Sequence, residues 1–422
     1  MFTSFSTALS ALNANSTAID VVGNNLANMN STGFKASSVA FRDLVTQSLD
    51  GGLGATQVGL GTAQPLTIRQ FTQGALQSSS GQLDAAIQGD GFFVLQDKNG
   101  NPLYTRAGNF LADKDGNLLT PSGANVQGWT TTHPLTGKIN TSGPIGNIIV
   151  PVGSLKPPTP TTNFSVDMNL DATAAADATS AFKTPITVYD SLGNSHVLTV
   201  AFQKTDVNTW SYQVQIPGSD VTSGTAGMPV DISGAGGTLT FDSSGQLTDP
   251  ATGSPITFDI PGLSSGAADM SLTWDPYTAA GAGRITQFGQ PSAPSASAQN
   301  GSTAGQLVHV GLVDGGQILA RYSNGDQVVV AQLAMASIRN ADTLIAAGNN
   351  DFQLSARTAA PSIGVPGTGG RGTIAGGSIE ASTVDIAREF TNLIVYQRGY
   401  QANSRVITTA DQLSQDTINL IR

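Results

Sequence analysis

Both ends of this 422-residue chain carry apolar residues at helical spacing, and the long stretch between them does not. Near the N-terminus the apolar positions recur at alternating intervals of three and four residues, which places them on one stripe of a helix, in a coiled-coil-like seam. The large apolar members of this stripe are Phe2, Phe5, Leu9, Leu12, Ile19 and Leu26. The pattern predicts a helix at the N-terminus.

A second helical stripe lies near the C-terminus. We expect this helix to run from about Thr383 to Ile421, with Ser382 or Thr383 as its N-cap. Asp385 then falls in the first turn, where a carboxylate interacts favourably with the helix dipole. The large apolar members of this stripe are Phe390, Leu393, Ile394, Tyr400, Val406, Leu413 and Leu420. The helix would extend for about 58 Å, which is more than a single small domain usually needs.

A lone amphipathic stripe most often faces the core of its own domain. Here two stripes lie at opposite ends of a chain that offers no comparable helix between them. The two helices must therefore pack on each other or on neighbouring copies of the chain. This arrangement favours a protein that assembles through its ends.

The residues between the two helices are dominated by Gly, Ser, Thr, Asn, Gln, Ala and Val, a composition that favours strands and turns. Short apolar runs separated by turn signals predict strands. The expected strands are Phe92–Gln96, Leu103–Thr105, Leu118–Thr120, Thr184–Asp190, His196–Phe202, Trp210–Ile216, Gln327–Ala334 and Leu344–Ala347. The stretch Asp97–Asn101 is echoed by Asp113–Asn117, and each predicts a hairpin turn with Gly or Asn at positive φ.

Segments rich in Pro and Gly mark the expected domain boundaries, at about Pro151–Pro160, Pro291–Gly305 and Ala360–Gly377. The predicted fold is mainly β with long terminal α-helices, and its domains are nested and discontinuous. The helices form a coiled-coil-like inner domain, followed by two outer β domains. The expected parts are a terminal helical polymerisation domain (1–30 and 378–422), an extended connecting segment (31–75 and 360–377), an inner β domain (76–146 and 300–359) and an outer β domain (147–299).

Composition argues against several classes of function. Only 11% of the residues are charged, and such a surface repels copies of itself weakly. The net charge of −10 and the scattered Lys and Arg argue against nucleic acid. Cysteine is absent, so no disulfide or thiolate chemistry is expected. No apolar run is long enough for a membrane span, and the first residues lack the basic region of a secretory signal. We expect any export to use a route without a cleaved signal peptide.

Two patterns resemble chemical sites, and we interpret both as structural. Gly367–Gly372 matches G-x-G-x-x-G but lies in a Gly- and Pro-rich linker, whereas a dinucleotide site needs a βαβ unit. Asp113 and Asp115 resemble half of a calcium loop, yet the twelfth position of that loop would be Ala124, which offers no ligand atom.

Side chains for acid–base or metal chemistry are scarce. The histidines His133, His196 and His309 lack the pairwise spacing of a zinc site, and Ser195 beside His196 would point to the opposite face of a strand. The only glutamates are Glu380 and Glu389. We therefore expect no catalytic, cofactor-binding or metal-binding residues and no enzymatic activity.

Four blocks of the sequence resemble the family of flagellar rod and hook proteins. Ala27–Lys35 resembles the signature that follows the first helix of that family, and Leu83–Gly128 is similar to its strand-rich domain. Tyr322–Gly325, followed by Gln332–Ala334, resembles the return of the chain into that domain, and Thr383–Arg422 resembles the terminal helix. The blocks occur in the family's order and cover both ends and the middle of the chain.

The insert between these blocks resembles the outer domain of the hook members of the family. Phe164–Ala172 and Thr184–Gly193 carry this likeness, and the chain length fits as well. Rod members share both ends but are much shorter, and a cap or junction protein explains the insert less well. A distal rod protein or another flagellar axial protein is the alternative, and a secreted adhesin-like binding module is a more distant one.

The resemblance implies a structural subunit that assembles with itself into the flagellar hook, a curved flexible tube that transmits torque from rod to filament as a universal joint. The implied partners are the distal rod protein below, the hook–filament junction protein above, the hook cap and the flagellar type III export apparatus. Nucleic acid and membrane insertion are not implied, and no cofactor is. The implied location is extracellular, after export as an unfolded chain.

We expect the assembly interface to combine the two apolar stripes with Asn28, Gly33 and Phe34 of the signature block. Asn28 can cap the end of the first helix and shape the following turn. Phe34 and Phe41 can anchor this segment on a neighbouring copy or in their own subunit, and the sequence leaves both alternatives open.

Overall fold

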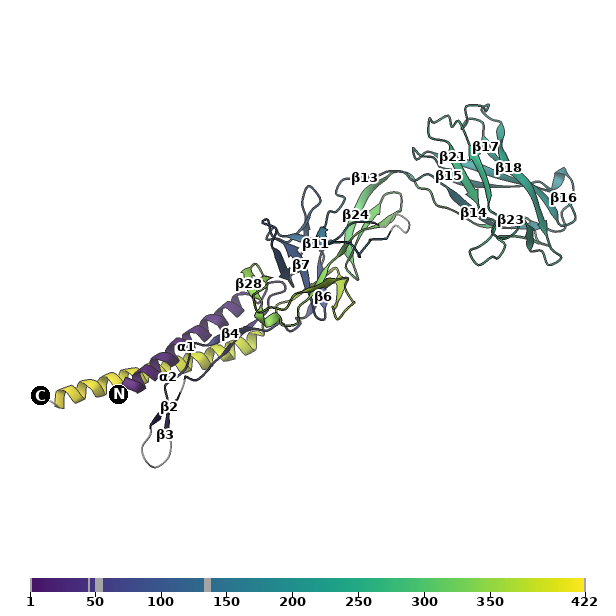
Figure 1. Ribbon diagram of the computed structural model, residues 1–422. Helices are drawn as coiled ribbons and strands as arrows, with labels where there is room; N and C mark the ends of the chain where they lie inside the picture. The colour runs from purple at the N-terminus through teal and green to yellow at the C-terminus, as the bar shows by residue number, and fades with distance from the viewer. Residues whose placement is uncertain (1, 45, 50–55, 133–137, 421–422) are drawn as a thin grey trace. The chain divides into compact units, whose positions relative to one another are not determined.

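The computed structural model describes residues 2–44, 46–49, 56–132 and 138–420 (Figure 1). The chain divides into two compact units. The terminal unit comprises Met1–Val152, His309–Ala320 and Val328–Arg422, and the insert unit comprises Gly153–Val308 and Arg321–Gln327. The fold is mainly β with a long helix at each end of the chain, which confirms the predicted fold class.

The terminal unit contains two long helices, α1 (Phe2–Ala27) and α2 (Ile386–Leu420), which lie side by side (Figure 1). The N-cap of α2 is Asp385, whose Oδ1 accepts a hydrogen bond from the backbone N–H of Arg388 at 3.1 Å. The predicted cap at Ser382 or Thr383 is therefore wrong. Thr383 Oγ1 instead accepts a hydrogen bond from the backbone N–H of Ala36 at 2.9 Å, so this hydroxyl joins the two ends of the chain. The predicted last residue of the helix, Ile421, lies outside the described residues.

An antiparallel sheet forms the centre of the terminal unit, in the strand order β26–β11–β7–β8–β29–β28. Along β7 (Phe92–Gln96), Phe93 and Leu95 belong to one buried cluster, and Phe92 and Val94 belong to another. Successive side chains of a strand point to opposite faces, so both faces of this sheet are covered. The other strands within the terminal unit are β1 (Ser37–Ala40), β2 (Thr46–Leu49), β3 (Thr56–Gly59), β4 (Leu66–Arg69), β5 (Leu76–Ser78), β6 (Ala85–Gln88), β8 (Pro102–Thr105), β9 (Leu111–Ala112), β10 (Leu118–Leu119), β11 (Asn125–Trp129), β12 (Gly146–Asn147), β27 (Met335–Ser337), β28 (Ile345–Gly348), β29 (Asp351–Gln353), β30 (Ser362–Gly364), β31 (Thr373–Gly376) and β32 (Ser378–Glu380).

The insert unit is built from two sheets around one core. One sheet has the order β20–β21–β14–β22, with β23 also paired to β14, and the other has the order β15–β16–β17–β18–β19. Side chains from both sheets, Trp210 and Trp274 among them, form a single buried cluster. The strands of these two sheets are β14 (Asn163–Asp171), β15 (Phe182–Tyr189), β16 (Ser195–Asp206), β17 (Thr209–Pro217), β18 (Pro229–Phe241), β19 (Leu247–Asp249), β20 (Ile256–Ile260), β21 (Met270–Trp274), β22 (Ile285–Phe288) and β23 (Ala293–Gln299). The short strand β13 (Leu155–Lys156) belongs to neither of them.

Three strands, β24 (Gly305–Val313), β25 (Gln317–Tyr322) and β26 (Gln327–Leu333), have residues in both units. Each of the eight predicted strands coincides with an observed one, with ends shifted by at most a few residues. The parts expected to be extended connectors contain paired strands. Within 31–75, β1 pairs with β4, and within 360–377, β31 pairs with β6 of the terminal unit. This pairing gives partners to backbone groups that a bare connector would leave without them.

The two predicted hairpin turns are confirmed. Gly100 and Gly116 have φ values of 87° and 84°, which is the region that glycine enters without steric cost. In the first turn, Asp97 Oδ1 accepts hydrogen bonds from the backbone N–H groups of Asn99 and Asn101 at 2.8 and 2.7 Å. The same arrangement recurs at Asp190 and Asp242 of the insert unit, two turns that sequence reasoning did not single out.

Candidate assembly site at the terminal helices

Helix α1 packs against α2 and β1, and most of its buried side chains are small. The buried residues of α1 are Ala8, Ala14, Ala18, Val22 and Asn25. On α2, Gly399 lies so close to Asn15 that an added Cβ would come within 2.9 Å of Asn15 Oδ1. The small residues let the two helices approach closely, and the large apolar side chains are left on other faces. Sequence reasoning missed this face because it followed large apolar residues and not alanine.

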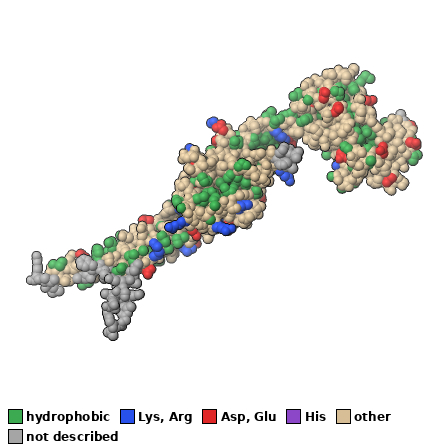
Figure 2. All heavy atoms as spheres, in the orientation of Figure 1, with side chains coloured by type: hydrophobic (Ala, Val, Ile, Leu, Met, Phe, Trp, Pro, Cys, Tyr) green, Lys and Arg blue, Asp and Glu red, His purple; other side chains and the backbone are tan. Residues whose placement is uncertain are grey.

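Most of the predicted apolar stripe does not face the partner helix. Phe5 and Leu9 of α1 are 43% and 45% exposed. On α2 the exposed members are Phe390, Ile394, Tyr400, Val406 and Leu413. Leu12, Ile19, Leu26 and Leu393 are half-buried. The side chains of Phe2 and Leu420 lie outside the described part of the chain. Hydrophobic side chains are visible along the surface of the paired helices in Figure 2. Exposed apolar surface of this kind commonly marks an interaction site.

The turn after α1 packs into its own chain. Gly33 has a φ of 68°, and an added Cβ there would lie 2.6 Å from the backbone nitrogen of Ala107, so only glycine fits without a backbone shift. Phe34 is buried in the subunit, which decides between the two alternatives for this residue. Phe41 is 42% exposed, and its ring centroid lies 5.8 Å from that of Tyr396 on α2. Asn28 accepts a hydrogen bond from Ser31 Oγ at 3.0 Å and donates to the Asn24 carbonyl at 2.9 Å, which caps the helix end as predicted.

A buried ion cluster beside the Gly33 turn joins three parts of the chain that are distant in sequence. Lys35 Nζ lies 2.6 Å from Glu380 Oε1, and Arg106 Nη1 lies 3.6 Å from Glu380 Oε2. All three side chains are at most 3% exposed. The backbone N–H of Gly74 also donates to Glu380 Oε1 at 2.7 Å, and Lys35 Nζ donates to the Thr72 carbonyl at 2.6 Å. The cluster therefore fixes the signature block, the sheet and the segment that leads into α2 against one another.

Burial dominates the electrostatics of the two cations. It lowers the pKa of Lys35, and the hydrogen bond and charge of Glu380 oppose that shift. Burial likewise lowers the pKa of Arg106, again against the charge of Glu380. Sequence reasoning did not predict this cluster, since Lys35 and Glu380 are 345 positions apart. The sequence offered one hint of it, the scarcity of glutamate. Both glutamates, Glu380 and Glu389, are buried.

The structure describes most of the residues in the patterns that resemble chemical sites. His196 lies between Asp190 and Asp220, with ring nitrogens 3.2 and 3.0 Å from their carboxylates. Gly367–Gly372 forms a tight turn in which Gly367 N–H donates to the Gly372 carbonyl. His133 lies outside the described residues. Over the described ranges, no cluster of three or more His, Asp or Glu has the geometry of a metal site. None of the helices described is long and apolar enough to cross a membrane.

The ends of the chain define a class of protein. Residues 5–35 match the family model described as flagella basal body rod protein, and residues 375–420 match the one described as flagellar basal body rod FlgEFG protein C-terminal. The matched residues contain most of α1, the Gly33 turn and α2. These are the segments that the helix pairing and the ion cluster hold together. The fold and the two ends therefore define a flagellar axial protein.

The rest of the chain identifies the family within that class. Residues 86–169 match the flagellar hook protein FlgE/F/G D1 domain, and residues 157–302 match the flagellar basal body protein FlaE D2 domain. The chain is 35% identical to the flagellar hook protein FlgE of Borreliella burgdorferi, covering all of both chains, and 33% identical to that of Escherichia coli, covering 99% of each. The chain belongs to the flagellar hook protein family.

A solved structure supports the fold. The crystal structure of Helicobacter pylori flagellar hook protein FlgE2 aligns with a TM-score of 0.54 at 15% identity, over 71% of this chain and 99% of that one. At this identity the likeness concerns the fold alone.

Proposed function

We propose that the chain is a structural subunit of the bacterial flagellar hook that assembles with copies of itself into a curved, flexible tube. The observation that carries the proposal is the exposure of the large apolar residues on both terminal helices. The two helices pack side by side and leave Phe5, Leu9, Phe390, Ile394 and Val406 exposed. At about 25 cal/mol per Å² of apolar surface, covering them with neighbouring copies would drive assembly.

The tube acts as a universal joint that transmits torque from rod to filament, and the subunit needs no catalytic group for this. Its further partners are the distal rod protein, the hook–filament junction protein, the hook cap and the type III export apparatus. The absence of cysteine supports export as an unfolded chain, because no disulfide would block threading. The polymer stands outside the cell, as the hook of the flagellum.

Each part of the predicted domain division would have its own role in the tube. The terminal helices carry the permanent contacts of the tube wall. The surface of the insert unit, rich in Ser, Thr, Gly and Asn with few charges, offers weak contacts that exchange as the tube bends. Changes of outer-domain contacts between protofilaments on compression would support this view, and a rigid, invariant interface would contradict it.

The alternatives make different predictions. A distal rod protein would not carry the insert 157–302 that matches the D2 family model. A secreted adhesin would bind its ligand as a monomer and would be indifferent to changes on the terminal helices.

The deciding experiment is self-assembly of the full-length chain, followed by light scattering and electron microscopy. We expect tubes or curved polymers from the native sequence. Ile394→Asp, on the exposed face of α2, should raise the critical concentration at least about tenfold, since a carboxylate would become buried in an apolar interface. Val207→Asp, at a 79% exposed position of the insert unit, is the matched control and should assemble normally. A native chain that stays monomeric at all concentrations, or an Ile394→Asp variant that assembles like the control, contradicts the proposal.

A further inference from the structure

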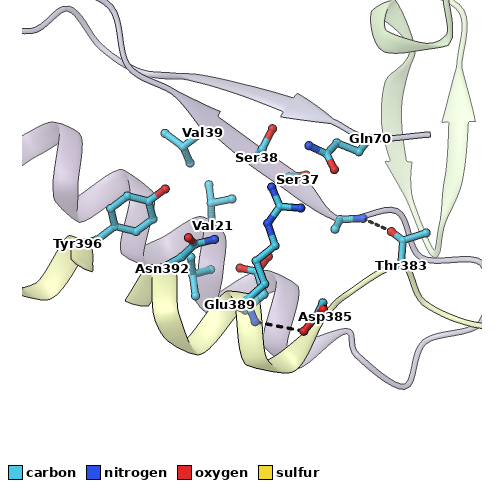
Figure 3. Close-up of a pocket in the computed structure, with 13 residues that line it drawn as sticks. Val21, Ser37, Ser38, Val39, Gln70, Thr383, Asp385, Glu389, Asn392 and Tyr396 are labelled. Carbon is cyan, nitrogen blue, oxygen red and sulfur yellow. Dashed lines mark hydrogen bonds between the residues drawn. The ribbon is translucent and has the colours of Figure 1, made fainter. Parts of the chain in front are cut away.

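A cavity of about 210 Å³ lies at the first turn of α2, where α1 and β1 meet it (Figure 3). Its lining is mainly polar. The side chains around it include Ser37, Ser38, Gln70, Asp385, Asn392 and Tyr396. Figure 3 shows that they come from three separate parts of the chain and surround a common space. Hydroxyl, amide and carboxylate oxygens of this kind can accept hydrogen bonds from a donor-rich group.

The cavity contains a buried acidic side chain, that of Glu389. Its side chain lines the cavity and is 93% removed from solvent, since only 7% remains exposed. Its Oε2 has no hydrogen-bond partner within the described part of the chain. The positive end of the α2 dipole offsets part of the cost of this buried charge. The remainder calls for a cation, because an unpaired buried carboxylate is costly.

Two arginines further along α2 lie on the opposite side of the helix from this cavity. Arg398 and Arg405 follow Glu389 by nine and sixteen residues. At 100° per residue, these intervals place both arginines roughly half a turn away from Glu389, and about 14 and 24 Å further along the axis. Both are exposed, and neither guanidinium has an ion-pair or hydrogen-bond partner among the described residues. A rigid helix therefore prevents either arginine from reaching Glu389 of the same copy.

We propose that the Glu389 cavity receives a guanidinium group from the Arg398/Arg405 face of a second copy of this chain. This inference rests on the proposed assembly of copies through their terminal helices. Charge complementarity supports it: the start of α2 presents a buried carboxylate, and its middle presents two unpaired guanidinium groups on the outer face. A planar guanidinium can bond a carboxylate through two parallel hydrogen bonds, and it leaves further N–H donors for the polar lining.

The competing occupant is Arg388 of the same chain, which also lines the cavity. No ion pair joins Arg388 to Asp385 or Glu389 in the described structure. Because its side chain already borders the cavity, it could supply a cation without a second copy. The test therefore includes Arg388 as a separate variant.

The experiment measures the critical concentration for assembly of the full-length chain and, at concentrations below it, the melting temperature of the monomer. Glu389→Gln should raise the critical concentration at least about tenfold, as expected for truncating one partner of a buried charge pair between molecules. It should leave the melting temperature unchanged or higher, because the monomer loses an uncompensated charge. A glutamate with a purely structural role would show the opposite: a lower melting temperature and unchanged assembly.

The arginine variants complete the test. Arg398→Gln with Arg405→Gln should weaken assembly to the same degree, and adding Glu389→Gln should weaken it no further, since all three remove one interaction. Arg321→Gln, an exposed arginine of the insert unit, is the matched control and should have no effect. The inference is overturned if Glu389→Gln assembles normally, or if Arg388→Gln alone reproduces its effect. A native chain that forms no polymer at all would instead overturn the proposed function.

Discussion

The buried cluster of Lys35, Arg106 and Glu380 contains two cations and one anion, and this imbalance predicts an unequal response to substitution. Glu380→Gln removes the carboxylate that both cations face and leaves two buried charges without it. Lys35→Met removes one cation and leaves Arg106 and Glu380 as a balanced pair. We therefore expect the conservative change at Glu380 to be the more destabilising of the two.

The magnitudes follow from the burial and the remaining partners. Breaking a buried ion pair by removing one partner costs about 3 to 5 kcal/mol. Glu380→Gln should fall at the upper end, at about 4 to 5 kcal/mol, since Lys35 and Arg106 are 0% and 3% exposed. Lys35→Met loses hydrogen bonds to Glu380 and the Thr72 carbonyl, but the Gly74 N–H still donates to the carboxylate at 2.7 Å. We expect this variant to cost about 2 kcal/mol.

Amide hydrogen exchange below the assembly concentration can measure both costs. The N–H of Gly33, which donates to the Glu380 carbonyl at 2.8 Å, reports on the cluster directly. Its exchange should accelerate by about three orders of magnitude in Glu380→Gln and by one to two in Lys35→Met, at about 1.4 kcal/mol per factor of ten. Amides of β17 in the insert unit serve as the internal control and should be unchanged. If Lys35→Met exchanges as fast as Glu380→Gln, charge balance does not govern the stability of this cluster.

Two further predictions concern the terminal unit. Burial raises the pKa of Asp351 to about 6, so the folded state binds the proton of this carboxyl more tightly than the unfolded state does. Proton binding therefore stabilises the fold; the stabilisation is complete below the unfolded pKa and is lost as the pH rises through 6. Asp351→Asn should therefore raise the unfolding free energy by about 1 to 2 kcal/mol at pH 8 and leave it unchanged at pH 4. Chemical denaturation at both pH values measures this difference, and equal effects at the two pH values would contradict the reasoning. Gly33→Ala should cost at least about 2 kcal/mol, because alanine is strained at φ 68° and its Cβ would meet the backbone of Ala107. Gly153→Ala has the same φ but open space around the added Cβ, so it should cost only about 1 kcal/mol, and melting curves that show equal losses would contradict the role of this close approach.

Local patterns in the sequence determined the parts of this fold that depend on near neighbours. The spacing of Phe5 and Leu9 predicts α1 because a helix repeats every 3.6 residues, and the Asp97–Asn101 turn follows from aspartate and glycine chemistry within five residues. The family resemblance of the two ends identified the class of protein before any contact was known. The helix and turn predictions hold because each depends only on residues that are near one another along the chain.

The tertiary structure alone decided which face of each helix pairs within the subunit and which residues are held in the interior. Ala14 and Ala18 are buried, whereas Phe390 and Ile394 are exposed, and a stripe of large apolar residues does not reveal this. Phe34 is buried in its own subunit, an alternative that the sequence left open. Lys35 meets Glu380 although 345 positions separate them, and the Glu389 cavity exists only where α1, β1 and α2 come together. Such pairings depend on how distant segments pack, and a periodicity within one segment contains no information about its partner.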